Sequence, residues 1–258
     1  MTRLMLASLL AACLAAPAAW AADAPFVGAW KLDPAKSQVA DQMKVEGAGG
    51  KRYSFDFGSG TETVTADGSD QPGYGGTTLA VTLSGPDALK VVRKKDGHVL
   101  LTAEWKLSQD GASLSDDFTS FAPDGTPSNL KYLYKRTAGT AGFAGTWESA
   151  SVAVNFSLTL KIQPYGKDGL SVISPAADKP KDLRFDGKDY PNLSSNAPAG
   201  ATYSARRSED GKLEITDKLG GKMLDTQEYA LSADGKTLTL TIRRPGMRTP
   251  NVFVFERS

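Results

Sequence analysis

Few side chains in this sequence have the chemistry of a catalyst. The chain contains one histidine, His98, and one cysteine, Cys13. A strand is predicted over residues 98–108, and its alternation puts His98 on the outer face with Lys106, with no motif that supplies a serine partner. Histidine-cluster and thiolate metal sites need several such ligands. We therefore expect a protein that is not an enzyme, with no catalytic residue, no metal ligand and no cofactor.

Carboxylates are the remaining candidates for acid–base chemistry. Asp116 and Asp117 are adjacent, and neighbours on a strand point to opposite faces of a sheet, so they cannot form a working pair by themselves. The sequence also contains eight Asp-Gly pairs, four in each half. Asp-Gly is a strong hairpin signal, because both positions tolerate the positive φ that tight turns require.

One predicted inward face carries polar residues. In the segment MLDTQEYALS (223–232), alternation places Asp225, Gln227 and Tyr229 on the same face. Polar groups inside a barrel are costly unless they are satisfied, so Asp225 and Gln227 indicate a polar ligand pocket. A bulge or a one-residue slip of register would instead turn them outward.

The aligned strand of the first half is apolar on the corresponding face, with Leu101 and Trp105 at the positions of Asp225 and Tyr229. The predicted ligand-lining residues are therefore Leu101, Trp105, Asp225, Gln227 and Tyr229.

The elements that must position these residues are strands. Val99 to Leu107 alternates apolar and polar residues, and Leu238, Leu240 and Ile242 alternate with threonines. A period of two, with hairpin turns between the runs, predicts antiparallel meanders and an all-β fold.

The chain repeats its motifs in the same order. FVGAW (26–30) returns as FAGTW (143–147), SQDGASLS (108–115) as SADGKTLT (232–239), and YLYKR (132–136) as FVFER (253–257). The repeat predicts two consecutive eight-stranded antiparallel barrels, over 22–136 and 143–258, with a flexible linker at 137–142.

Gly-x-Trp on a first strand, a meander of about eight strands and an arginine at the end of the last strand resemble the lipocalin pattern of the calycin superfamily. The chain looks similar to tandem lipocalin-like proteins exported by bacteria. The resemblance implies that Trp30 pairs with Arg136, and Trp147 with Arg257, to close one end of each barrel.

The first residues have the anatomy of a signal peptide, with Arg3, an apolar run and small residues before Ala21. We expect cleavage after residue 21 and a periplasmic or secreted protein. The alternative is lipid anchoring through Cys13, which follows a lipobox-like Leu10-Ala11-Ala12. The apolar run is too short for a transmembrane segment.

The chain carries 30 basic and 29 acidic side chains. Because the net charge is close to zero, nucleic acid is a poor candidate for a partner. The leading hypothesis is a binding protein that holds a small apolar or amphipathic ligand in a barrel cavity. The alternative is an envelope interaction or structural module that binds a protein partner.

Overall fold

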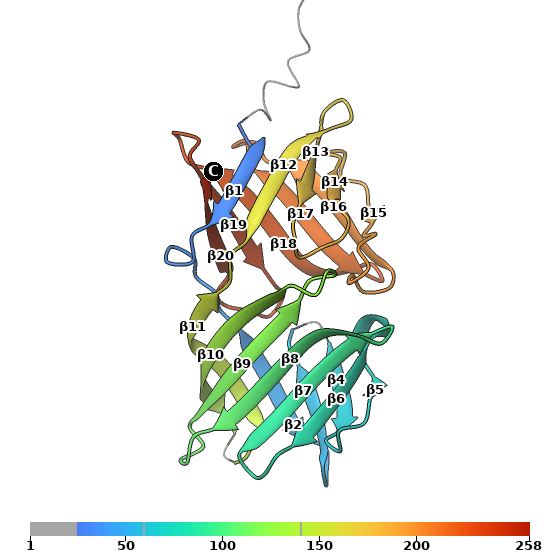
Figure 1. Cartoon of the computed structure of the whole chain (residues 1–258), viewed down its shortest axis with the longest axis vertical. Helices are drawn as coiled ribbons and strands as arrows, with labels where there is room; N and C mark the ends of the chain where they lie inside the picture. Colours follow the sequence, from blue (N-terminus) through green and yellow to red (C-terminus); the bar gives the residue numbers. More distant parts are fainter. Residues whose placement is uncertain (1–24, 59, 140) are drawn as a thin grey trace, which may run out of the picture.

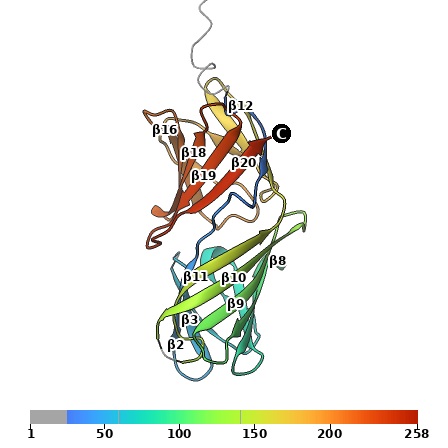
Figure 2. The same cartoon turned by 90° about the vertical axis from the view of Figure 1, so that its left-hand side faces the viewer.

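The structure, a computed structural model, describes residues 25–258 apart from 59 and 140. The predicted signal peptide and Cys13 lie outside these residues. The fold is all-β, with two curled ten-stranded antiparallel sheets, one nearly closed into a barrel and the other forming a half-barrel. The two sheets are stacked end to end along the long axis of the molecule (Figures 1 and 2).

The sheet in the lower half of Figure 1 is called the N-terminal sheet. In the order of pairing, its strands are β4 (Thr61–Thr65), β3 (Arg52–Asp56), β2 (Gln42–Gly47), β11 (Gly145–Asn155), β10 (Pro127–Ala138), β9 (Ser113–Phe121), β8 (His98–Leu107), β7 (Ala88–Lys95), β6 (Thr78–Leu83) and β5 (Gln71–Pro72). A short 3-10 helix, η1 (Tyr74–Gly76), lies between β5 and β6.

The other sheet is called the C-terminal sheet. In the order of pairing, its strands are β14 (Lys181–Leu183), β13 (Gly169–Ile173), β12 (Thr159–Tyr165), β1 (Gly28–Leu32), β20 (Asn251–Arg257), β19 (Thr237–Arg243), β18 (Lys222–Leu231), β17 (Leu213–Leu219), β16 (Ala201–Arg207) and β15 (Tyr190–Pro191).

The two sheets repeat the same register, which confirms the internal repeat. Trp105 of β8 lies opposite Leu89 of β7, and the equivalent Tyr229 of β18 lies opposite Leu213 of β17. Each sheet has ten strands and not the predicted eight. In the N-terminal sheet the missed strands are β2 and β5. β2 buries only two side chains, Met43 and Val45, and β5 has two residues.

The first strands of the two repeats are exchanged between the sheets. β1 lies between β12 and β20 of the C-terminal sheet, whereas β11 lies between β2 and β10 of the N-terminal sheet. Residues 137–142, the predicted linker, therefore join two strands of one sheet and do not connect the two sheets, because β10 continues to Ala138 and pairs with β11. Strands that are consecutive in the chain favour this hairpin pairing. The chain crosses between the sheets at 33–41 and at 156–158.

The exchange also changes the tryptophan–arginine pairs. The predicted pairing of Trp30 with Arg136 and of Trp147 with Arg257 is wrong. The guanidinium carbon of Arg257 lies 4.2 Å from the centre of the Trp30 ring, and that of Arg136 lies 4.1 Å from the Trp147 ring. Each arginine stacks on the tryptophan of the neighbouring strand in its own sheet, and that strand belongs to the other repeat.

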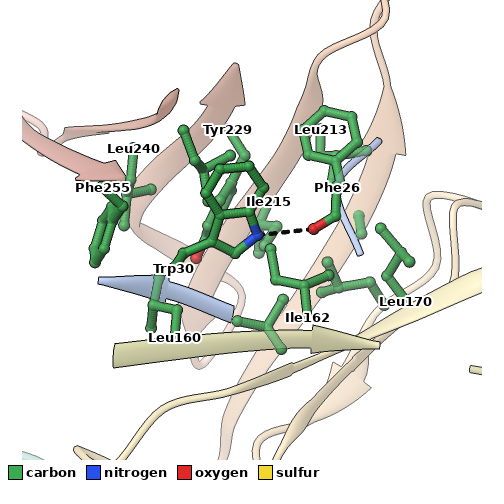
Figure 3. Packing of buried hydrophobic residues seen from close by; sticks show 14 of the residues in the cluster. Phe26, Trp30, Leu160, Ile162, Leu170, Leu213, Ile215, Tyr229, Leu240 and Phe255 are labelled. Atoms are coloured by element: carbon green, nitrogen blue, oxygen red, sulfur yellow. Dashed lines mark hydrogen bonds between the residues drawn. The ribbon is translucent and has the colours of Figure 1, made fainter. Parts of the chain in front are cut away.

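The two cores surround these tryptophans. Trp30 is fully buried among Phe26, Leu160, Tyr229, Phe255 and other side chains of the C-terminal sheet (Figure 3). Its indole N–H donates a hydrogen bond of 2.9 Å to the carbonyl of Phe26. Trp147 makes the same 2.9 Å bond to the carbonyl of Phe143 in the N-terminal sheet.

These tryptophan–arginine ends lie at opposite poles of the molecule. β11 starts at the lower pole and runs toward the C-terminal sheet, and the end of β20 lies at the upper pole (Figure 1). The other ends of the two sheets face each other. There, the N–H of Ala199 donates to the carbonyl of Gly75, and Lys95 donates to the carbonyls of Ser195 and Ala197.

Candidate ligand-binding site

A cavity of about 410 Å³ lies within the N-terminal sheet, and the C-terminal sheet contributes to its wall. Its apolar wall includes Phe55, Phe57, Leu101, Trp105, Phe118 and Phe253. Its polar groups include Asp41, Glu62, Arg93, Asp116, Tyr132 and Arg244. Mostly apolar walls with a few placed polar groups, enclosing a volume of this size, are typical of small-molecule sites.

Aromatic rings form much of the wall. The Phe55 and Trp105 rings meet edge to face with centres 5.9 Å apart, and Phe57 meets Trp105 in the same way at 6.3 Å. Phe118 and Tyr132 make a further edge-to-face pair at 6.2 Å. Such pairs hold the rings in fixed orientations, so the cavity has a defined shape.

Asp116 lies inside this aromatic wall. On β9 it shares the inward face with Leu114 and Phe118, whereas Asp117 points outward and forms an ion pair of 2.9 Å with Lys131. Asp116 is only 5% exposed, and its cross-strand neighbours are Trp105 on β8 and Tyr132 on β10. The two adjacent aspartates therefore lie on opposite faces, as predicted.

Two buried polar atoms at this point have no partner among the described residues. They are Oδ1 of Asp116 and the indole Nε1 of Trp105, which is itself only 3% exposed. Burial raises the pKa of Asp116 to about 7, a rise that the nearby Trp105 N–H opposes and the Asp41 charge supports. An unmade hydrogen bond on a buried group costs about 1–3 kcal/mol, so such groups usually serve a purpose in a native protein.

A second carboxyl, the half-buried Asp41, lies at the end of the cavity nearest the C-terminal sheet. The Tyr134 hydroxyl donates a hydrogen bond of 2.7 Å to Oδ2 of Asp41, and Arg244 lies 4.0 Å from its Oδ1. Burial raises the pKa of Asp41, and the Tyr134 bond and the Arg244 charge only partly offset this effect. Two hydrogen bonds of 2.9 Å with Ser149 on β11 position Asp41: its N–H donates to the Ser149 hydroxyl, and its carbonyl accepts from the Ser149 N–H.

The remaining charged pair in the cavity is satisfied. Arg93 forms two hydrogen bonds with the Glu62 carboxylate, of 2.9 Å and 2.5 Å, and the N–H of Tyr74 donates a third of 2.5 Å. Although burial raises the pKa of Glu62, these bonds lower it overall. Glu62 and Arg93 are therefore a charged, internally neutral pair.

The predicted residues Asp225, Gln227 and Tyr229 lie in the other sheet. The amide of Gln227 donates hydrogen bonds of 2.6 Å to Asp217 and 3.1 Å to Asp225, and Lys181 binds Asp217 at 2.8 Å. Asp225 and Gln227 are half-buried, and Tyr229 is packed in the C-terminal core. These polar groups are thus satisfied by the protein itself.

The predicted site residues therefore fall into two groups. Leu101 and Trp105 line the cavity, and the structure does not bring them together with Asp225, Gln227 and Tyr229. Sequence reasoning missed Asp41 and Asp116 as cavity residues. The signal for Asp116 was its alternation with Leu114 and Phe118, whereas nothing local marks Asp41, which precedes a short strand.

Within the described residues, no helix is long and apolar enough to cross a membrane, and no group of three or more His, Cys, Asp or Glu side chains is arranged to hold a metal ion. A search with models of known protein families and a comparison with curated protein sequences found no match.

Proposed function

We propose that this protein is an exported, non-enzymatic binding protein that holds a small amphipathic molecule in the cavity of the N-terminal sheet. The observation that carries this proposal is the pair of buried, unpartnered polar atoms, Asp116 Oδ1 and Trp105 Nε1, within a largely aromatic wall. A ligand that combines an apolar body with a hydrogen-bonding group complements both features.

The alternative, a module that binds a protein partner, predicts filled interiors and a continuous exposed apolar patch. The most exposed large apolar side chains of the described residues are on separate elements: Val99 on β8, Leu133 on β10, Leu193 in a loop and Met223 on β18. The 410 Å³ cavity also favours the small-molecule proposal.

The proposal is tested with N-phenyl-1-naphthylamine, a small dye that becomes fluorescent in apolar surroundings. We expect saturable binding to the full chain and at least a roughly tenfold loss of affinity in Leu101→Trp, because the larger side chain fills the cavity. Leu133→Trp is the matched control, since Leu133 is 44% exposed on another strand. Equal dye binding by Leu101→Trp and the wild type would rule out the cavity as the site.

A further inference from the structure

We propose that the ligand is an amphiphile with a single positive charge, whose ammonium group binds at Asp116. This inference rests on the proposed function and specifies the chemical class of its ligand. The argument uses the charges of the cavity, the two unpartnered atoms and the surrounding rings.

The charges of the cavity wall do not balance. Three carboxyl groups line it, those of Asp41, Glu62 and Asp116, against two guanidinium groups, those of Arg93 and Arg244. Glu62 is neutralised by Arg93, and Asp41 has Arg244 at 4.0 Å and the Tyr134 hydroxyl at 2.7 Å. Asp116 has no cationic partner among the described residues, so one bound positive charge completes the balance.

The position of Asp116 favours a ligand group that donates hydrogen bonds over one that accepts them. An ionised carboxylate only accepts hydrogen bonds, and an ammonium group supplies three donors. A carboxylate ligand would instead be repelled by Asp116 and Asp41 in a site of low dielectric constant. The indole N–H of Trp105, on the neighbouring strand, lowers the pKa of Asp116. It therefore favours the ionised carboxylate, which is the form that binds a cation.

The rings around Asp116 suit a cation as well. Trp105, Tyr132 and Phe118 are its neighbours on β8, β10 and β9, and all three line the cavity. Aromatic faces attract ammonium groups, most strongly where water is excluded. The rest of the wall then accommodates the apolar part of the ligand.

This arrangement links binding to pH. The charged and titratable groups around Asp116 are Asp117 on the same strand, Asp41 and Arg244 toward the C-terminal sheet, and Tyr132 and Tyr134 on β10. Both tyrosines stay neutral because burial raises their pKa values. The ionised fraction of Asp116 therefore controls the affinity for a cation, which rises with pH across neutrality.

The test compares three ligands with the same alkyl chain, decylammonium, decanol and decanoate, by calorimetry on the full chain. At pH 8 we expect decylammonium to bind at least roughly tenfold more tightly than decanol, and decanoate to bind most weakly. Between pH 5.5 and pH 8 the affinity for decylammonium should rise roughly thirtyfold, from the change in the ionised fraction.

Asp116→Asn and Asp117→Asn form a matched pair of variants, because each removes one negative charge from adjacent positions on opposite faces of β9. We expect Asp116→Asn to retain decanol binding but to lose the preference for decylammonium and the pH dependence, while Asp117→Asn behaves as the wild type. A thermal melt of each variant verifies that it is folded.

The outcomes separate the two proposals. If decanol binds but decylammonium binds no better, or if Asp116→Asn keeps the preference, the assignment of a cationic ligand is wrong and the binding function stands. If none of the three ligands binds and the naphthylamine dye does not bind either, the proposed function itself is wrong.

Discussion

At the scale of single residues, Asp116 and Leu240 occupy equivalent positions in the two sheets, each opposite an aromatic residue, Trp105 or Tyr229. Leu240 is packed in an apolar core, whereas Asp116 places a carboxyl group in a cavity. The same fold therefore accepts leucine at this position. The difference between the two sheets at this position is what we expect if Asp116 serves the proposed binding and not folding.

Replacing Asp116 should stabilise the protein. We expect Asp116→Leu to raise the free energy of unfolding by about 2 kcal/mol at pH 8, because it removes a buried carboxyl without a full set of hydrogen-bond partners. Urea denaturation measures the change. Asp117→Asn is the surface control and should alter stability by less than about 0.5 kcal/mol. A destabilised Asp116→Leu variant would indicate a structural role for the carboxyl.

The same residue gives the stability a characteristic pH dependence. The pKa of Asp116 in the folded protein is about 7, above its ordinary value of 3.8. Between these two values the unfolded chain releases a proton that the folded protein retains, so Asp116 makes stability fall as the pH rises from about 4 to 7. The melting temperatures of the wild type and Asp116→Asn, measured at several pH values in this range, should be equal near pH 4 and differ increasingly above it. A difference between the two melting temperatures that stays constant with pH would contradict the raised pKa of Asp116.

At the scale of elements, the shared motifs build the closed end of each sheet. The guanidinium of Arg136 lies on the Trp147 ring and donates hydrogen bonds to the carbonyls of Gly111, Gly142 and Ala144. Arg257 makes the matching contacts with Trp30 and with the carbonyls of Gly235, Val27 and Pro25. An Asp-Gly turn, a Gly-x-Trp strand and a terminal arginine thus form one unit in each sheet.

The glycine of each Gly-x-Trp motif is required by this unit. Gly28 has a φ of 150°, and a Cβ atom there would lie 2.8 Å from a guanidinium nitrogen of Arg257. We expect Gly28→Ala to lower the free energy of unfolding by roughly 1–3 kcal/mol, from backbone strain and the displaced arginine. Gly47→Ala is the control, since a Cβ atom added there would meet no atom within 4 Å among the described residues, apart from its own chain neighbours. Equal denaturation midpoints for the two variants would contradict this explanation.

Some of this organisation could be predicted from the sequence and some could not. Alternation and Asp-Gly turns are local signals, so they indicated β8, β19 and the antiparallel hairpins. The pairing of β1 with strands of the C-terminal sheet is a long-range contact, which local patterns do not reveal. The motifs at Trp30 and Trp147 are nearly identical, so the sequence does not show which of them belongs to which sheet. The cavity partners of Asp116 likewise come from long-range pairing and from a loop near Asp41.

At the scale of the whole molecule, the exchanged strands join the two sheets into one structure. Neither repeat contains all ten strands of a sheet: β11 completes the N-terminal sheet, and β1 completes the C-terminal sheet. The C-terminal sheet also supplies Arg244, Asn251 and Phe253 to the cavity. Formation of the complete site therefore requires both sheets.

A comparison of fragments tests this exchange. We expect residues 38–155, which hold all ten strands of the N-terminal sheet, to fold cooperatively, with β-sheet circular dichroism and a sigmoidal thermal transition. Residues 25–136 should remain largely unfolded, because they lack Trp147 and leave β2 and β10 as open edges. A fragment 25–136 that folds as well as 38–155 would show that β1 can replace β11.

The central claim, that the cavity beside Trp105 and Asp116 binds a small amphipathic ligand, is tested most directly by the indole resonances of the tryptophans in a ¹⁵N–¹H NMR spectrum. The Trp105 N–H makes no hydrogen bond with the residues that the structure describes, whereas those of Trp30 and Trp147 donate to the carbonyls of Phe26 and Phe143 at the two poles. On titration with decylammonium, the account predicts a saturable shift of the Trp105 signal alone. An unchanged Trp105 signal, or shifts of the Trp30 and Trp147 signals equal to that of Trp105, would contradict it.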